Sequence, residues 1–282
     1  MRKHYSLLLA ALSVLLSPSP LQAQTIPLVP ERGGHATTLL QSGKVLVTGG
    51  ANEEGTLKSA LLYDPVINSF TATGAMIAAR GDHTSTLLSG GRAFITGGEN
   101  STTVLQSAEV YEPPTGTFAL TPRGMSVARN NHTATLLWDG TVLVDGVGVA
   151  DIHDPVTNTF VPTSGTPVNR KSHMATLLQD GTVLITGGYV NGISSNTAEI
   201  YNPATQAFML LGDHMNISRA NHTSTLLPSG KVLITGGFSG TSPHAETEIY
   251  DPVSQTFTLS GKMSYNRSNI TGSSCRAMAE WL

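Results

Sequence analysis

The stretch RKSHMATLLQDGTVLITGG at residues 170–188, followed by TAEIYNPATQAF at residues 197–208, recurs in similar form along most of the chain. The copies are spaced by roughly 41 to 49 residues, a period typical of propeller blades. They begin at Arg32, Arg80, Arg129, Arg170 and Arg219. A sixth start, RSNIT, follows at Arg267. This repeat decides the fold.

Each copy contains four strand-sized pieces separated by turn signals. A segment such as HTATLL at residues 132–137 precedes a short turn with glycine and then a β-branched run such as VLITGG at residues 183–188. The paired glycines end that strand, and a proline ends the third piece because it cannot continue a hydrogen-bonded ladder. The fourth piece is centred on phenylalanine. Four antiparallel strands per repeat predict an all-β propeller with five complete four-stranded blades and the start of a sixth.

The order of hydrophobic residues, double glycine and two spaced aromatics resembles the kelch motif from about Arg32 to Arg267. The resemblance implies a kelch-type β-propeller of the galactose oxidase and kelch-like superfamily, as in bacterial secreted kelch proteins. It also implies that the HTATLL strand lines a central channel and that the phenylalanine strand is outermost. As a guide to function the resemblance is weak, because one fold hosts many activities.

Two departures from the repeat matter. In the third copy, DGVG at residues 145–148 replaces the TGG ending, and the following loop is nearly absent. At the end of the chain, Ile270 stands where histidine is expected. Kelch propellers usually close with six or seven blades, so the chain either closes with five or is a truncated form of a larger propeller.

The first residues have the layout of a secretory signal peptide. Arg2 and Lys3 precede an apolar run from Leu7 to Leu16, which is too short to span a bilayer. We therefore expect a signal peptide at residues 1–23, a propeller at 24–266 and an incomplete sixth repeat or irregular tail at 267–282. The protein is then secreted or periplasmic, with no membrane association after cleavage.

Charge and cysteine content argue against nucleic-acid binding and exclude stabilisation by a disulfide. The net charge is −3 and lysine and arginine are not clustered, which argues against nucleic acid as a partner. A single cysteine, Cys275, rules out an intramolecular disulfide, so stability must come from packing.

Arginine and histidine recur once per repeat, and we interpret both as structural. Metal sites need a few ligands that converge at about 2 Å, whereas equivalent positions in successive blades are spread apart. The histidines are His35, His83, His132, His173 and His222. The arginines are expected to pair with acids of the third strand, which are Glu109, Asp151, Glu199 and Glu248. The first repeat has Leu61 at that position, so four pairs are predicted for five arginines.

Enzymatic alternatives have less support in the sequence. Copper oxidases resembling galactose oxidase use a tyrosine cross-linked to a cysteine, a second tyrosine and two histidines, but Cys275 lies outside the complete repeats. No copper or other cofactor is therefore predicted. A mutarotase-like activity would need an acid–base pair, for which Glu53, Glu54 and Glu99 in the loops are candidates.

Residues that vary within the fixed repeat predict a ligand-binding face. They lie in loops after the double glycines, such as residues 189–196, and directly after each arginine. The predicted residues are Glu53, Glu54, Asp82, Glu99, Asn100, Asn130, Asn131, Lys171, Tyr189, Asn191, Asn221, Phe238 and His244. The short third loop should leave a notch through which an extended ligand could exit.

The sequence favours a secreted, non-catalytic scaffold that binds a protein, peptide or glycan with this loop face. Tyr189 and Phe238 are the only loop aromatics after the double glycines, which favours protein or peptide over glycan. The alternatives are a carbohydrate-active propeller enzyme, mutarotase-like or galactose-oxidase-like, and a truncated fragment without independent function.

Overall fold

The computed structural model describes residues 31–165, 167–240 and 242–267, and these contain strands and turns but no helix. The described part is all-β, as predicted. It accordingly has no helix long and apolar enough to cross a membrane. The predicted signal peptide and the residues after Arg267 lie outside the described residues.

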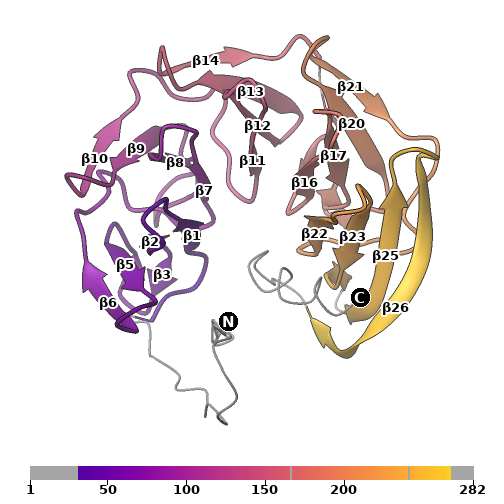
Figure 1. Ribbon diagram of the computed structural model, residues 1–282, viewed down its shortest axis with the longest axis horizontal. Coiled ribbons are helices and arrows are strands. Elements are labelled where there is room, and N and C mark those ends of the chain that lie inside the picture. The colour runs from indigo at the N-terminus through magenta and orange to yellow at the C-terminus, as the bar shows by residue number, and fades with distance from the viewer. Residues whose placement is uncertain (1–30, 166, 241, 268–282) are drawn as a thin grey trace. The chain divides into compact units, whose positions relative to one another are not determined.

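The chain divides into two compact units, with the boundary between Leu120 and Thr121. Antiparallel sheets follow one another along the chain, and each contains the four pieces of one repeat in sequence order (Figure 1). Short accessory hairpins lie in the loops after the double glycines.

The first unit has two four-stranded sheets and one two-stranded hairpin. The first sheet is β1 (Ala36–Leu39), β2 (Val45–Thr48), β5 (Ala60–Asp64) and β6 (Ser69–Ala72), with the hairpin β3 (Ala51–Asn52) and β4 (Gly55–Thr56) in its loop. The second sheet is β7 (Thr84–Leu87), β8 (Ala93–Thr96), β9 (Ala108–Glu112) and β10 (Thr117–Leu120).

The second unit has three such sheets. The third sheet is β11 (Thr133–Leu136), β12 (Val142–Gly146), β13 (Val149–Asp154) and β14 (Thr159–Pro162). The fourth is β16 (Met174–Leu177), β17 (Val183–Thr186), β20 (Ala198–Asn202) and β21 (Ala207–Leu210), beside a small sheet of β15 (Arg170–Lys171), β18 (Tyr189–Val190) and β19 (Ile193–Ser194). The fifth is β22 (Thr223–Leu226), β23 (Val232–Thr235), β24 (Phe238–Ser239), β25 (Ser242–Asp251) and β26 (Thr256–Arg267).

The core of each unit lies between successive sheets. The second strands β8, β17 and β23 are buried along their whole length, which explains their unbroken apolar sequence. In the second unit, Leu184 of the fourth sheet shares a cluster with Val232 and Tyr250 of the fifth. Burial of each side chain of this size contributes about 1.5–3 kcal/mol. The apolar face of one sheet is therefore stabilised by its neighbour.

The turn between the third and fourth strands begins with the same side-chain contact in four of the five repeats. Asp154 Oδ1 accepts a hydrogen bond from Val156 N at 2.8 Å, and Asp251 and Val253 repeat this contact at 2.9 Å. One later turn residue in each repeat has a left-handed backbone, with φ between 54° and 67°. These residues are Asn68, Gly116, Asn158, Gln206 and Gln255. A proline that follows Asp, Asn or Glu thus marks the hairpin that brings the two repeat aromatics together.

The sixth arginine occupies a repeat position at the edge of the fifth sheet. Gly237 N donates to the carbonyl of Arg267 at 2.8 Å. Gly188 N makes the same bond to Arg219 O at 2.9 Å. The backbone of Arg267 therefore caps the fifth sheet as Arg219 caps the fourth.

Candidate functional site

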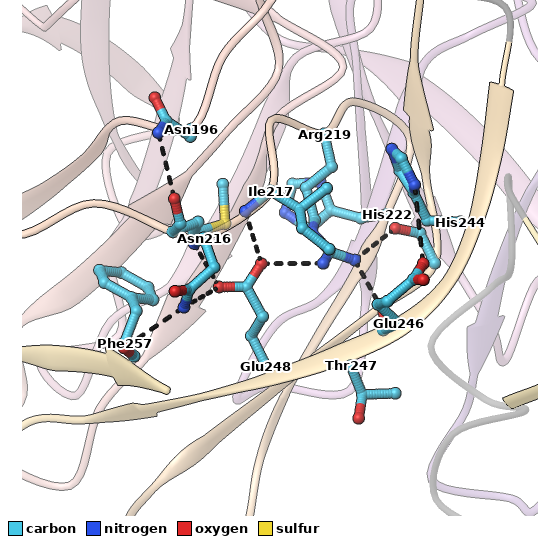
Figure 2. A network of polar contacts seen from close by, with 12 residues as sticks. Asn196, Asn216, Ile217, Arg219, His222, His244, Glu246, Thr247, Glu248 and Phe257 are labelled. Carbon is cyan, nitrogen blue, oxygen red and sulfur yellow. Dashed lines mark hydrogen bonds and ion pairs between the residues drawn. The ribbon is translucent and has the colours of Figure 1, made fainter. Parts of the chain in front are cut away.

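Each repeat arginine after the first ties three segments of its sheet together. In the fifth repeat, Arg219 Nη2 donates to Glu248 Oε1 at 2.8 Å, and Nη1 donates to the carbonyls of Gly236 (2.7 Å) and Glu246 (3.1 Å). Glu248 also accepts hydrogen bonds from the backbone N–H groups of Asn216 and Ile217 (Figure 2). The buried charges are thus paired and hydrogen-bonded, as burial requires.

The same pairing recurs in three other repeats. The pairs are Arg80 with Glu109 (2.9 Å), Arg129 with Asp151, and Arg170 with Glu199 (2.8 Å). In the first repeat, Arg32 donates to the carbonyls of Gly49 and Ser59. The four arginine–acid pairs that the sequence predicts are therefore present, and they form a framework inside the sheets.

Within a unit, the repeat histidine of one sheet contacts the sheet before it. His83 Nε2 lies 2.8 Å from Thr48 Oγ1, and His222 Nε2 lies 2.8 Å from Thr186 Oγ1. Burial, reinforced by the nearby arginine, lowers the pKa of each imidazole to about 3, so both are neutral at ordinary pH. Within the described ranges, no three His, Cys, Asp or Glu side chains come together in a way that could hold a metal ion.

The third repeat breaks this contact. Asp145 replaces the threonine and is completely buried, with its Oδ2 3.5 Å from His173 Nε2. His173 Nε2 instead lies 2.9 Å from Thr133 Oγ1. Burial, with a contribution from Glu199, raises the pKa of Asp145 to about 7, and burial lowers the pKa of His173 to about 3. Between about pH 3 and pH 7 both groups are therefore largely neutral, and the contact is not an ion pair.

The second residue after each arginine places the loop side chains. This residue has a left-handed backbone in every repeat, with φ between 50° and 64°. The residues are Gly34, Asp82, Asn131, Ser172 and Asn221. Within a unit, its N–H donates to the carbonyl of its counterpart in the preceding sheet, as from Ser172 to Asn131 (2.7 Å) and from Asn221 to Ser172 (2.9 Å). This backbone chain holds the loops of the second unit side by side.

An open pocket of about 340 Å³ lies between the loops of the third and fourth repeats. Its lining residues are Asn130, Asn131, Asn169, Lys171, Ser172, Tyr189, Asn191 and Gly192. Lys171 Nζ donates to Asn130 Oδ1 at 3.1 Å, which joins the two sides of the pocket.

Two local features shape this pocket. Lys171 and Tyr189 are paired across β15 and β18, and the hairpin to β19 turns through Asn191 and Gly192. Both turn residues have positive φ, 51° and 79°, as a two-residue type I′ turn requires. On the other side, Val147 and Gly148 join β12 directly to β13, so the third repeat has no accessory hairpin there. Val147 N donates to Arg170 O at 3.3 Å, which places this short turn beside the fourth repeat.

Five residues of the predicted ligand-binding face line the pocket: Asn130, Asn131, Lys171, Tyr189 and Asn191. Asn221, Phe238 and His244 lie in the next repeat of the same unit and are not among its lining residues. Asn169 is the lining residue that the pattern misses, because it precedes the repeat arginine instead of following it.

The remaining predicted residues lie in the first unit and serve local turns. Glu53 and Glu54 are exposed between β3 and β4, and Glu54 N donates to Asn52 Oδ1. Asn100 Oδ1 accepts hydrogen bonds from the backbone of Thr102 and Thr103. Glu99 forms backbone bridges with Gly81 and Val104, and Asp82 N donates to Gly34 O at 2.8 Å.

Comparison with known proteins agrees with this architecture. Residues 170–215 match the family model of the kelch motif. The chain is similar to the solved structure of a fungal alcohol oxidase of the AA5 family in complex with copper, with a TM-score of 0.70 and 21% identity. The match covers 83% of this chain and 54% of that one, so the chain spans about half the length of that structure. At this identity the likeness shows the fold alone. No curated protein matches the sequence.

The prediction against a copper oxidase site depends on Cys275, the only cysteine in the sequence, which lies outside the described residues. Two of the repeat histidines, His83 and His222, each contact a threonine hydroxyl.

Proposed function

We propose that this kelch-repeat β-propeller protein is a secreted, non-catalytic binding module whose ligand site is the pocket between the third and fourth repeats. The observation that carries the proposal is the lining of that pocket. Amide, hydroxyl and ammonium groups gather there at the loops that the sequence singles out as variable. A concave surface with several convergent polar groups is the usual form of a ligand site.

The lining supports binding over acid–base chemistry. It contains no carboxylate and no histidine, which are the groups that most often transfer protons in enzymes. Asp145 and His173 are buried below the loops and belong to the framework between sheets. The pocket can thus orient a ligand by hydrogen bonds without a general acid–base pair.

The enzyme alternative is favoured by one observation, the fold shared with a copper alcohol oxidase. The binding module and the copper oxidase predict different results in an oxygen-consumption assay. We expect the protein, incubated with copper, to consume no oxygen in the presence of primary alcohols or hexoses. Steady oxygen consumption above that of free copper would support the oxidase instead.

We also propose that the five sheets are the five complete blades of the propeller and that Arg267 begins a sixth. The bond from Gly237 N to Arg267 O supports this assignment, because it repeats the bond between Gly188 and the arginine of the next repeat. The short third loop would leave a notch beside the pocket, where an extended ligand could leave the surface.

The binding proposal is tested with two pocket variants and their matched controls on glycan and peptide arrays. Asn131→Gly removes a lining side chain while the left-handed backbone is retained, since glycine occupies the equivalent position 34. Asn221→Gly makes the same change outside the pocket. Tyr189→Ala is matched by Tyr265→Ala on β26, which is exposed.

We expect both pocket variants to weaken binding of a captured ligand about tenfold or more, as is usual for a buried contact near the centre of a site. The two control variants should bind as the wild type does. Unchanged binding in Asn131→Gly and Tyr189→Ala would place the ligand site elsewhere.

A further inference from the structure

The charge of the pocket comes from one lysine that lacks an acidic partner. Lys44, Lys231 and Lys262 each lie about 3 Å from a carboxylate oxygen, of Asp64, Asp251 and Glu246 respectively. Lys171 differs, because its ammonium donates to the neutral amide oxygen of Asn130. Among the described residues, no carboxylate lies within ion-pair distance of Lys171.

The absence of acids extends to the rest of the lining. The side chains around Lys171 are amides, one serine hydroxyl and one phenol, and none of them is a carboxylate. The pocket therefore presents one positive charge that nothing in its wall offsets. A ligand group that carries a negative charge would complete it, with a charge-assisted hydrogen bond from the ammonium.

The other lining groups indicate what carries that negative charge. Each asparagine amide offers two donors and one acceptor, which suits hydroxyl groups that also donate and accept. Asn131, Asn169 and Asn191 provide three such amides beside Ser172. Tyr189 is half-buried on β18 and adds one flat ring. The lining has no aliphatic side chain, whereas peptides are usually anchored by a side chain in an apolar pocket.

We propose that the pocket binds an acidic glycan, with a sugar carboxylate or sulfate at the Lys171 ammonium and the hydroxyls on the asparagine amides. The sugar ring would lie against Tyr189. This inference rests on the proposed binding function and names its ligand class. The volume is at the lower end of the range for ligand pockets, roughly 300–1,000 Å³, so the pocket holds one end of a chain whose remainder lies over the loops.

The test is a calorimetric titration of the full mature chain with three probes: an oligogalacturonate, its fully methyl-esterified form and a sulfated neutral oligosaccharide of the same length. Methyl esterification removes the charge and keeps the hydroxyls. We expect the wild type to prefer at least one acidic probe over the neutral ester by about tenfold, the effect of one well-placed charged contact. The stronger of the two acidic probes identifies the anion.

Variants of Lys171 and Tyr189, with a control at Lys231, separate the contribution of the charge from that of the aromatic ring. Lys171→Gln should abolish the preference for the acidic probe over the ester, while Lys171→Arg should keep the preference. Lys231→Gln removes a lysine that pairs with Asp251, and it should change neither binding constant. Tyr189→Ala should weaken acidic and neutral probes alike.

Equal affinity for the acidic and esterified probes would overturn the inference, as would a preference that survives in Lys171→Gln. Failure of all three probes to bind would overturn it as well. In each case, the proposed binding function would still stand if a different ligand, captured on the arrays, lost its binding in Asn131→Gly and Tyr189→Ala. If no ligand bound more weakly to either of those two variants, both the acidic-glycan inference and the proposed binding function of the pocket would be wrong.

Discussion

A single residue change within a repeat can reverse the chemistry of its surroundings. At the end of the second strand, the hydroxyls of Thr48 and Thr186 satisfy the histidine of the next sheet at 2.8 Å. Asp145 occupies this position in the third repeat, and neither of its oxygens has a hydrogen-bond partner among the described residues. A buried carboxyl without donors favours its neutral form.

This burial predicts a pH dependence that belongs to Asp145. The charged and titratable groups that act on it are His173, Glu199, Arg170 and Arg129. The pKa of Asp145 is about 7 in the folded protein, whereas the ordinary value for an aspartate side chain is 3.8, so the stabilising contribution is fully present below pH 3.8 and is lost as the pH rises toward 7. Linkage gives a loss of about 1.4 kcal/mol per pH unit within this window.

The measurement is urea unfolding of the wild type and Asp145→Asn between pH 4.5 and 8. We expect the stability of the variant relative to the wild type to increase with pH up to about 7 and then to become constant. Glu53→Gln, on an exposed turn, controls for the loss of one negative charge. A difference that does not vary with pH would mean that Asp145 is ionised in the folded protein throughout.

At the scale of elements, the double glycine contacts the next sheet of the same unit. Gly187 has a φ of 59°, and a Cβ atom there would lie 2.3 Å from Arg219 O and 2.9 Å from His222 Cε1. Gly49 has the same surroundings from Arg80 and His83. The first glycine is therefore required twice, once by its backbone conformation and once by the close approach of the following arginine.

Three glycine-to-alanine variants separate these two requirements. Gly192 has a φ of 79° with no atom near its added Cβ, and Gly212 also has open space. We expect Gly212→Ala to change the free energy of unfolding by less than about 0.5 kcal/mol. Gly192→Ala should cost about 1–2 kcal/mol from the left-handed backbone, and Gly187→Ala about 3 kcal/mol or more because the clash adds to it. Urea unfolding ranks the three, and equal costs for positions 187 and 192 would contradict the clash.

The elements follow directly from the repeat, whereas the pocket depends on contacts between repeats. Strand positions and the four arginine–acid pairs could be predicted because each pair lies within one repeat at equivalent positions, 29 residues apart in three repeats and 22 apart in the shortened third. The pocket depends on the bond from Ser172 to Asn131, and its residue Asn169 stands where the repeat carries no signal. The raised pKa of Asp145 likewise depends on burial and on Glu199 of the following repeat. The sequence shows that a repeat residue is replaced, but it does not show which residue of the neighbouring repeat the new side chain contacts.

For the whole molecule, stability depends on how each sheet covers the next within its unit. In the second unit, Leu143 of the third sheet packs in one cluster with Val183 and Tyr201 of the fourth. The fourth sheet in turn packs on the fifth through Leu184 and Val232. Stability in such arrays is a sum of repeat terms and interface terms, so a local loss is passed to adjoining sheets.

Glu248→Gln tests this coupling by weakening the fifth sheet alone. Glu248 is buried and bound by Arg219 and two backbone N–H groups, so loss of its charge should cost about 3 kcal/mol. We expect faster native-state hydrogen exchange in β11 to β21 as well as in β22 to β26. When the fifth sheet opens, the fourth sheet loses its packing partner, and the third sheet is then destabilised in turn. Glu109→Gln makes the same change in the first unit and serves as the matched variant for β1 to β10. Faster exchange confined to β22 to β26 would show that the sheets of the second unit open independently, and each would then have to be stable without its neighbour.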